Sequence, residues 1–260
     1  MTIAKDKLIV ALDVDNAERG LQLFDTLRHT VGMFKVGMQL FTAAGPDFVR
    51  QIISRGGRVF LDLKYHDIPN TVALAGIEAT RLGVSIFNVH ASGGREMLTR
   101  AAAAVAETAA RESLPRPRVI AVTLLTSVDQ ETLKQIGVNG SPETMVSRLA
   151  LLAEQTGLDG VVASAREIER IRETVSKSDF LIVTPGMRSA GAASDDQRRT
   201  MGVAGAIRSG ADYIVVGRPV LAAPNPAAAA EQIVAEIAAD LSTAAPAADL
   251  PEQSHTQSVH

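Results

Sequence analysis

Two oppositely charged residues interrupt an apolar run that has the composition of a buried β-strand. Asp62 and Lys64 stand near the end of the segment from Arg58 to Lys64, and Asp67 follows a few residues later. Residues two apart in a strand project to the same face, so the Asp62 carboxylate and the Lys64 ammonium group are expected side by side. Burying such charges costs free energy unless they are paired or functional. The pair is therefore either a structural ion pair or part of a site that uses a carboxylate and an ammonium group.

The elements that would position these residues are short apolar runs that alternate with amphipathic segments. Such alternation predicts parallel strands connected by helices. A helix is predicted after each strand, the second over residues 46–54 and the last over 226–241. The predicted strands cover residues 8–13, 33–37, 58–64, 84–90, 118–124, 159–163, 180–184 and 212–216.

Eight regular strand–helix units in a chain of 260 residues predict an α/β fold, the closed (β/α)8 TIM barrel. An open, doubly wound sheet is the alternative. Such a sheet seldom has eight regular units without a second domain, and no G-x-G-x-x-G motif follows the first predicted strand. The barrel is therefore the favoured fold.

The composition is that of a globular protein with a sizeable core, because 46% of the residues are hydrophobic and 21% are charged. We expect one domain over residues 1–241, whose N-terminus leads directly into the first strand, and a disordered tail over 242–260. A net charge of −3 gives no basic surface for nucleic acid, and no apolar stretch is long enough to span a membrane. The absence of cysteine excludes disulfides and fits a reducing cytoplasm, where we expect the protein to reside.

In a barrel of this kind, functional side chains gather at the carboxyl ends of the strands. Two lysines and three aspartates from the first three strands would meet there, which makes a purely structural ion pair a poor explanation. No set of residues has the pattern of a metal site, and His66 and His90 are interpreted as structural. The candidates at the strand ends are Asp13, Lys35, Asp62, Lys64, Asp67, Asn88, His90, Thr126, Ser127, Arg188 and Arg218.

The end of the eighth predicted strand has features of a phosphate site. Gly217 and Arg218 follow this strand, and backbone N–H groups and a guanidinium group both suit a phosphate dianion. Barrels frequently bind phosphate after strands seven and eight. Arg188, on the loop after strand seven, and Gln197, near the end of that loop, are predicted to close over the ligand as a lid.

Several segments occur in the order typical of one enzyme family. Together they resemble the bacterial type of the orotidine 5′-phosphate decarboxylase family, over about residues 8 to 240, and the DLKxHDIPNT motif alone is highly specific. The chain departs from the family pattern at Met187, where isoleucine is common, and in its extra tail. The matching segments are KVG (35–37), DLKYHDIPNT (62–71), NVHASGG (88–94), VTLLTS (122–127), TPGMR (184–188) with Asp196-Gln197, and VVGRP (215–219).

The resemblance implies decarboxylation of orotidine 5′-monophosphate to UMP, the last step of de novo UMP biosynthesis, without a metal or organic cofactor. It implies a catalytic array of Lys35, Asp62, Lys64 and Asp67, in which Lys64 is the proton donor. It also implies a homodimer with shared active sites, in which Asp67 and Thr71 reach into the site of the partner subunit.

The resemblance further implies a set of residues that bind the nucleotide. Besides Lys35, Asp62 and Thr71, they are Asp13 at a ribose hydroxyl, Thr126 and Ser127 near the pyrimidine, and Gln197, Gly217, Arg218 and Arg188 around the phosphate.

Two other functions remain open on the sequence. A related metal-dependent sugar-phosphate decarboxylase or aldol synthase shares the D-x-K-x-x-D pattern, but such barrels carry an acidic residue at the position of Lys35 to help hold magnesium. A non-catalytic barrel that binds a phosphate ligand would need no proton donor such as Lys64. The complete charged array favours the decarboxylase.

Overall fold

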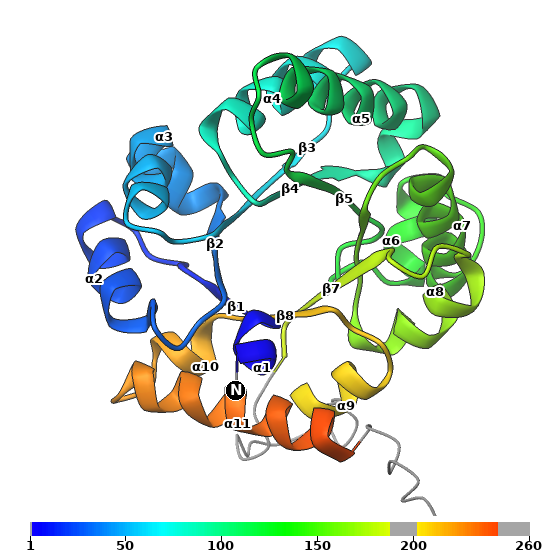
Figure 1. Ribbon diagram of the computed structural model, residues 1–260. Helices are drawn as coiled ribbons and strands as arrows, with labels where there is room; N and C mark the ends of the chain where they lie inside the picture. Colours follow the sequence, from blue (N-terminus) through cyan, green and yellow to red (C-terminus); the bar gives the residue numbers. More distant parts are fainter. Residues whose placement is uncertain (1, 188–201, 244–260) are drawn as a thin grey trace, which may run out of the picture.

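The computed structural model describes residues 2–187 and 202–243, so Arg188, Gln197 and the tail from residue 244 onward lie outside the described residues. Its eight strands form a closed parallel barrel in chain order, and β8 pairs with β1 to complete the ring. The predicted TIM barrel is confirmed (Figure 1). The strands are β1 Leu8–Ala11, β2 Met33–Gly37, β3 Val59–Tyr65, β4 Ile86–His90, β5 Arg118–Val122, β6 Gly160–Val162, β7 Leu181–Pro185 and β8 Tyr213–Val216.

Helices surround the barrel on its outside (Figure 1). Local sequence sets several of their ends: the Asn16 side chain caps α2, Pro69 lies in the first turn of α4, and Gly83 ends α4 with a left-handed φ of 81°. The helices are α1 Thr2–Asp6, α2 Ala17–Leu27, α3 Met38–Ser54, α4 Pro69–Leu82, α5 Gly94–Arg111, α6 Gln130–Gln135, α7 Pro142–Gln155, α8 Ile168–Thr174, α9 Val203–Arg208, α10 Arg218–Leu221 and α11 Pro226–Thr243.

Alternate residues of each strand face the barrel interior and the surrounding helices. The larger apolar cluster packs the sheet against the helices, and a smaller one fills the interior. Phe60 belongs to the interior cluster, so Asp62, two residues further along β3, points inward above it. The interior cluster consists of Ile9, Ala11, Met33, Phe60, Ile86, Ile120, Val183 and Val215.

The N-terminal part of the chain contains two helical segments that the sequence did not predict. The chain does not lead directly into the first strand, because the five-residue helix α1 precedes β1. A helix this short has no periodic pattern and depends on packing against the rest of the chain. Gly32 allows this packing, because a Cβ at that position would lie only 2.6 Å from Asp6 Cα at the end of α1. The predicted helix over residues 46–54 forms the second part of α3; an unpredicted first part begins at Met38, and the two parts meet at a kink at Gly45, whose φ is 66°. Pro46 therefore marks the continuation of α3 after the kink.

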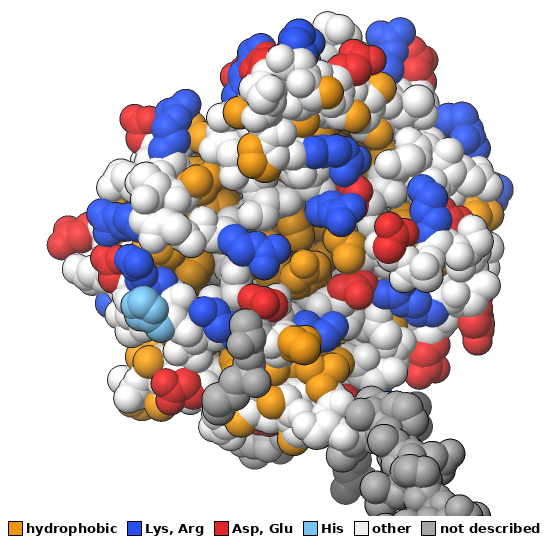
Figure 2. All heavy atoms as spheres, viewed as in Figure 1, with side chains coloured by type: hydrophobic (Ala, Val, Ile, Leu, Met, Phe, Trp, Pro, Cys, Tyr) orange, Lys and Arg blue, Asp and Glu red, His pale blue; other side chains and the backbone are white. Residues whose placement is uncertain are grey.

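The end of the barrel at which α1 lies does not contain the candidate residues. Figure 2 shows this face, where Lys and Arg side chains stand around a small apolar area. A hollow with an empty volume of about 720 Å³ lies here, lined by residues that include Lys5, Arg28 and Arg58. The strands run away from this face, so their carboxyl ends meet at the opposite end of the barrel. No helix within the described ranges is long and apolar enough to cross a membrane.

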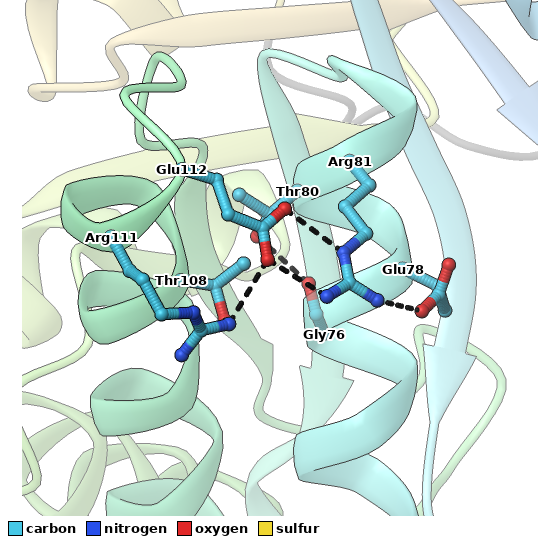
Figure 3. Close-up of polar contacts among 7 residues, drawn as sticks. All are labelled: Gly76, Glu78, Thr80, Arg81, Thr108, Arg111 and Glu112. Carbon is cyan, nitrogen blue, oxygen red and sulfur yellow. Dashed lines mark hydrogen bonds and ion pairs between the residues drawn. The ribbon is translucent and has the colours of Figure 1, made fainter.

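An exposed ion-pair network joins the C-terminal ends of α4 and α5 (Figure 3). The guanidinium group of Arg81 donates two hydrogen bonds to the carboxylate of Glu112, at 3.0 and 2.8 Å, and a third to Glu78 at 2.7 Å. Arg111 donates to the same Glu112 carboxylate at 3.0 Å. Since α4 begins directly after the Asp67 loop, this network anchors the far end of the helix that follows that loop.

Replacing Glu112 with glutamine is expected to remove an acid-sensitive contribution to stability. Hydrogen bonds from Arg81 and Arg111 lower the pKa of Glu112 from 4.5 to about 2. Because the folded-state pKa lies below the ordinary value, the ionised carboxylate stabilises the fold above pH 4.5 and this contribution is lost as pH falls toward 2. The effect will be small because the network is exposed to solvent.

Thermal unfolding of the wild type and of Glu112→Gln as a function of pH measures this effect. The difference in Tm should shrink as the solution is acidified. Glu131→Gln is the control, because Glu131 makes only an exposed contact with Lys134 at 3.9 Å. A Tm difference that does not depend on pH would contradict the prediction.

Candidate active site

Four charged side chains form an alternating chain at the carboxyl ends of β1, β2 and β3. Lys64 Nζ lies 2.6 Å from Asp62 Oδ1, and Lys35 Nζ lies 3.3 Å from the other oxygen of the same carboxylate. Lys35 Nζ also lies 3.1 Å from Asp13 Oδ1. The side chains of Lys35 and Asp62 are each only 13% exposed, whereas that of Asp13 is 54% exposed. The array therefore runs from the rim of the barrel into its interior.

Strand register and two glycines allow these side chains to meet. In the parallel ladder Ala11 pairs with Lys35 and Gly37 pairs with Asp62, which places the three strand ends at nearly the same level. A Cβ at Gly37 would lie 2.9 Å from Lys35 Nζ, and one at Gly217 would lie 3.3 Å from Asp13 Oδ2. Larger residues at either position would displace a member of the array.

The charges of the array keep Asp62 ionised. Burial alone would raise the pKa of Asp62, but the positive charge of Lys35 and the hydrogen bond and charge of Lys64 hold it below its ordinary value. The pKa of the neighbouring His90 is also lowered, by burial and by the positive charges of His66 and Lys64. For a histidine, a lowered pKa favours the uncharged form. The rings of His66 and His90 lie 5.4 Å apart. At neutral pH the site thus holds an ionised carboxylate and an uncharged His90.

A cavity with an empty volume of about 630 Å³ opens beside the array. Its lining combines the charged side chains of Lys35, Asp62 and Lys64 with residues that are apolar apart from Thr126. Such a cavity suits a flat ring whose charged substituent faces the array. The remaining lining residues are Phe60, Val122, Leu124, Leu125, Thr126, Val162, Ala163, Pro185 and Val215.

Only part of the predicted site lines this cavity. Thr126 does so, whereas Ser127 does not, although it is the next residue in the chain. Asp67 and Thr71 are exposed, and the Asp67 carboxylate accepts a hydrogen bond from the N–H of Ile68 at 2.6 Å. Within residues 2–187 and 202–243, Asp67 makes no ion pair with Lys64.

The predicted phosphate residues lie on a different part of the mouth. Gly217 follows β8 and lies next to Asp13, and the exposed Arg218 begins the four-residue helix α10. Arg188 and Gln197 lie outside the described residues. Among the residues that are described, no group of three or more His, Asp and Glu side chains could hold a metal ion.

Sequence reasoning did not identify the apolar wall or the role of Asn88. Leu124, Val162 and Pro185 belong to strands or strand ends whose apolar pattern is the same as that of the core, so no local signal marks them as cavity residues. Asn88 was a candidate by its position at the end of a strand. In the structure it is buried and its side chain contacts both Asp62 and Lys64.

The fold and this site define a class of protein: a (β/α)8 barrel with a cavity in which ammonium groups can stabilise developing negative charge. The model of the orotidine 5′-phosphate decarboxylase / HUMPS family matches residues 6–233. The chain therefore belongs to this family.

Individual relatives agree with this assignment. An orotidine 5′-phosphate decarboxylase from Moorella thermoacetica is 57% identical over 90% of this chain and 93% of its own length. The enzyme of the same name from Geotalea daltonii is 55% identical over 91% of this chain and 98% of its own length. Among solved structures, the orotidine 5′-phosphate decarboxylase from Lactobacillus acidophilus is 36% identical, with a TM-score of 0.78 over 88% of this chain and 98% of that one.

Proposed function

We propose that this protein is an enzyme that decarboxylates orotidine 5′-monophosphate to UMP and carbon dioxide, the last step of UMP biosynthesis. The observation that carries the proposal is the alternating array of Asp13, Lys35, Asp62 and Lys64 beside a largely apolar cavity. Relatives named for this activity match over nine tenths of the chain, which supports the same conclusion.

Lys64 is the proton donor in the proposed reaction. When the bond between the pyrimidine ring and its carboxylate breaks, carbon dioxide leaves and the electron pair stays on an sp² ring carbon. The ring π system cannot absorb this pair, so nearby positive charge must stabilise it. Lys64 Nζ supplies that charge and then transfers a proton to the carbon, which forms the C–H bond of UMP. Solvent afterwards returns a proton to the lysine.

Asp62 has two roles in this proposal. Its carboxylate, which accepts a hydrogen bond from Lys64 Nζ at 2.6 Å, holds the ammonium group of the lysine in place before the reaction. It would also lie close to the carboxylate of the substrate. The repulsion between the two anions is relieved as neutral carbon dioxide forms, so the ionised state of Asp62 favours decarboxylation.

The rest of the nucleotide is proposed to bind around the mouth. Asp13 and Lys35 hold a ribose hydroxyl, and Thr126 and Ser127 lie near the pyrimidine. The phosphate binds at Gly217 and Arg218 together with Gln197 and Arg188, and closing a lid over it helps to organise the site.

We further propose a homodimer in which Asp67 and Thr71 complete the site of the partner subunit. On the described chain these two side chains are exposed, and Asp67 does not contact the array. Large apolar side chains are exposed on the neighbouring surface: Met38 is 55% exposed, Ile68 66% and Leu74 54%. Contact with a second copy would bury them and bring Asp67 to a Lys64 side chain.

A spectrophotometric assay without added cofactor, run with and without a chelator, tests the function. The proposed chemistry needs no metal or organic cofactor. We also propose that the enzyme resides in the cytoplasm and has no nucleic-acid or membrane partner. Ultraviolet absorbance should report consumption of orotidine 5′-monophosphate at the same rate in both samples. An inactive protein would overturn the proposal, and turnover abolished by the chelator would favour the metal-dependent sugar-phosphate branch.

Replacing Arg218 with alanine is expected to raise KM about 10- to 100-fold, because a charged hydrogen bond to the phosphate is lost. The change in kcat should be smaller if the guanidinium group acts mainly in binding. Steady-state kinetics measure both constants, with Arg100→Ala on the exposed surface of α5 as the control. An unchanged KM would exclude Arg218 from the phosphate site.

A further inference from the structure

Lys64 has an unusual backbone conformation. Its φ of 54° lies in the left-handed region, which residues other than glycine seldom adopt; Ser113 is the other such residue within the described ranges. The ladder between β3 and β4 shifts register between Leu61 and Tyr65, so Lys64 lies within an irregular part of the strand. Such a conformation persists only when the surroundings hold it.

A single side chain of the neighbouring strand contacts this irregular segment at two points. Asn88 in β4 is 1% exposed. Its Oδ1 accepts a hydrogen bond from the backbone N–H of Lys64 at 2.8 Å, and its Nδ2 donates to Asp62 Oδ1 at 2.7 Å. The same Asp62 oxygen accepts from Lys64 Nζ at 2.6 Å. One amide thus joins the backbone of the lysine to the carboxylate that binds its side chain.

We propose that Asn88 is a positioning residue for the decarboxylation, acting through Lys64 and Asp62 and not through the substrate. It satisfies the Lys64 N–H that the shifted ladder leaves available, and so holds the lysine at positive φ. It also fixes the rotamer of Asp62, so that Oδ1 faces Lys64 and Oδ2 faces Lys35. This inference rests on the proposed function, because it assigns a catalytic consequence to the geometry of Lys64.

The chemistry of the amide explains why asparagine stands at this position. A side chain at this position must accept a hydrogen bond from the backbone N–H of Lys64 and donate one to the carboxylate of Asp62. It must also be short enough to fit between the two groups. Alanine provides neither group. Aspartate has the same shape and keeps the acceptor, but its second oxygen would face the Asp62 carboxylate at the 2.7 Å separation now filled by a hydrogen bond. Two ionised carboxylates at this separation repel each other strongly.

The kinetic test compares Asn88→Ala with the wild type. Asn88 is not among the residues that line the cavity, so KM should stay within about threefold. We expect kcat to fall about 100-fold, since a displacement of roughly 1 Å in a catalytic group can have this effect. Glu154→Gln is the matched control: Glu154 is also buried and accepts hydrogen bonds from the N–H groups of Ser176 and Lys177, but it lies away from the array.

Asn88→Asp provides a second test that keeps the shape of the side chain. When the introduced carboxyl group shares a proton with Asp62, it can donate a hydrogen bond to Asp62 as the amide does; when both groups lose their protons, they repel. The kcat of Asn88→Asp relative to wild type should therefore rise as pH falls, whereas that of Asn88→Ala should stay level. The other titratable groups around this pair are Lys35 from β2, Lys64 on β3, His90 from β4, His66 beside it and Asp13 beyond Lys35.

A crystal structure of Asn88→Ala decides the geometric claim independently of the substrate. We expect Lys64 to leave its positive φ and the ion pair between Lys64 and Asp62 to break. The proposal would be overturned if Lys64 kept its conformation in Asn88→Ala, or if kcat stayed within about threefold of wild type. It would also be overturned if activity fell only through a higher KM or a smaller folded fraction. If the wild type itself does not act on orotidine 5′-monophosphate, the proposed function fails, while the crystal structure still tests the positioning role.

Discussion

Lys64→Ala is expected to lower kcat by at least about 10⁴-fold, because the substitution removes both the proton donor and the nearest positive charge. The fold should survive, since Asp62 keeps its contacts with Lys35 and Asn88. Steady-state turnover of orotidine 5′-monophosphate measures the loss, and titration with UMP shows whether the nucleotide site is retained.

Lys134→Ala is the matched control for this substitution. Lys134 is a largely exposed lysine on α6, far in sequence from the array, and its removal should leave kcat unchanged. If Lys64→Ala retained more than about a hundredth of the wild-type kcat while binding UMP normally, the proton would have to come from another group.

A mixed dimer of Lys64→Ala and Asp67→Ala chains is expected to recover about half of the wild-type activity, since one of its two sites would be complete. In that site one chain supplies Lys35, Asp62 and Lys64, and the other supplies Asp67. Each homodimeric variant alone should be nearly inactive. Co-expression with two different affinity tags, followed by purification on both, isolates the mixed dimer for the assay.

The reciprocal mixed dimer is the control. A chain carrying both substitutions, paired with a wild-type chain, has no complete site if Asp67 acts across the interface. If Asp67 instead acted within its own chain, this second dimer would be the active one and the first would be inactive. The two arrangements therefore give opposite results, and activity in the second alone would exclude shared sites.

The barrel and the centre of the site could be predicted because both follow from short sequence patterns. The alternation of strands and helices determines the topology, and the topology brings the carboxyl ends of β1, β2 and β3 together. Asp13, Lys35, Asp62 and Lys64 needed no further information to be placed at one mouth. Their contacts of 2.6 to 3.3 Å agree with that expectation.

The remaining features depend on packing between distant segments, which local patterns do not report. The left-handed φ of Lys64 accompanies a register shift between two strands, and DLKY alone resembles a regular strand. Asn88 lies 24 residues from Lys64, so its contact with the backbone of the lysine has no signal in either segment. The helix α1 is too short for a periodic pattern, and the kink at Gly45 separates the predicted part of α3 from the part that begins at Met38.

The packed interior at the end of the barrel where α1 lies has a consequence for the release of products. Apolar side chains from the described strands, including Met33 and Phe60, fill the interior, and α1 lies at the N-terminal end. Because these side chains pack the barrel axis, we expect the products of the proposed reaction to leave from the end that holds the cavity. If the ribose and phosphate bind around the mouth as proposed, carbon dioxide forms deeper in the cavity than they bind, and it passes the nucleotide on its way out. Any segment that covers this opening therefore controls the exit of both products at once.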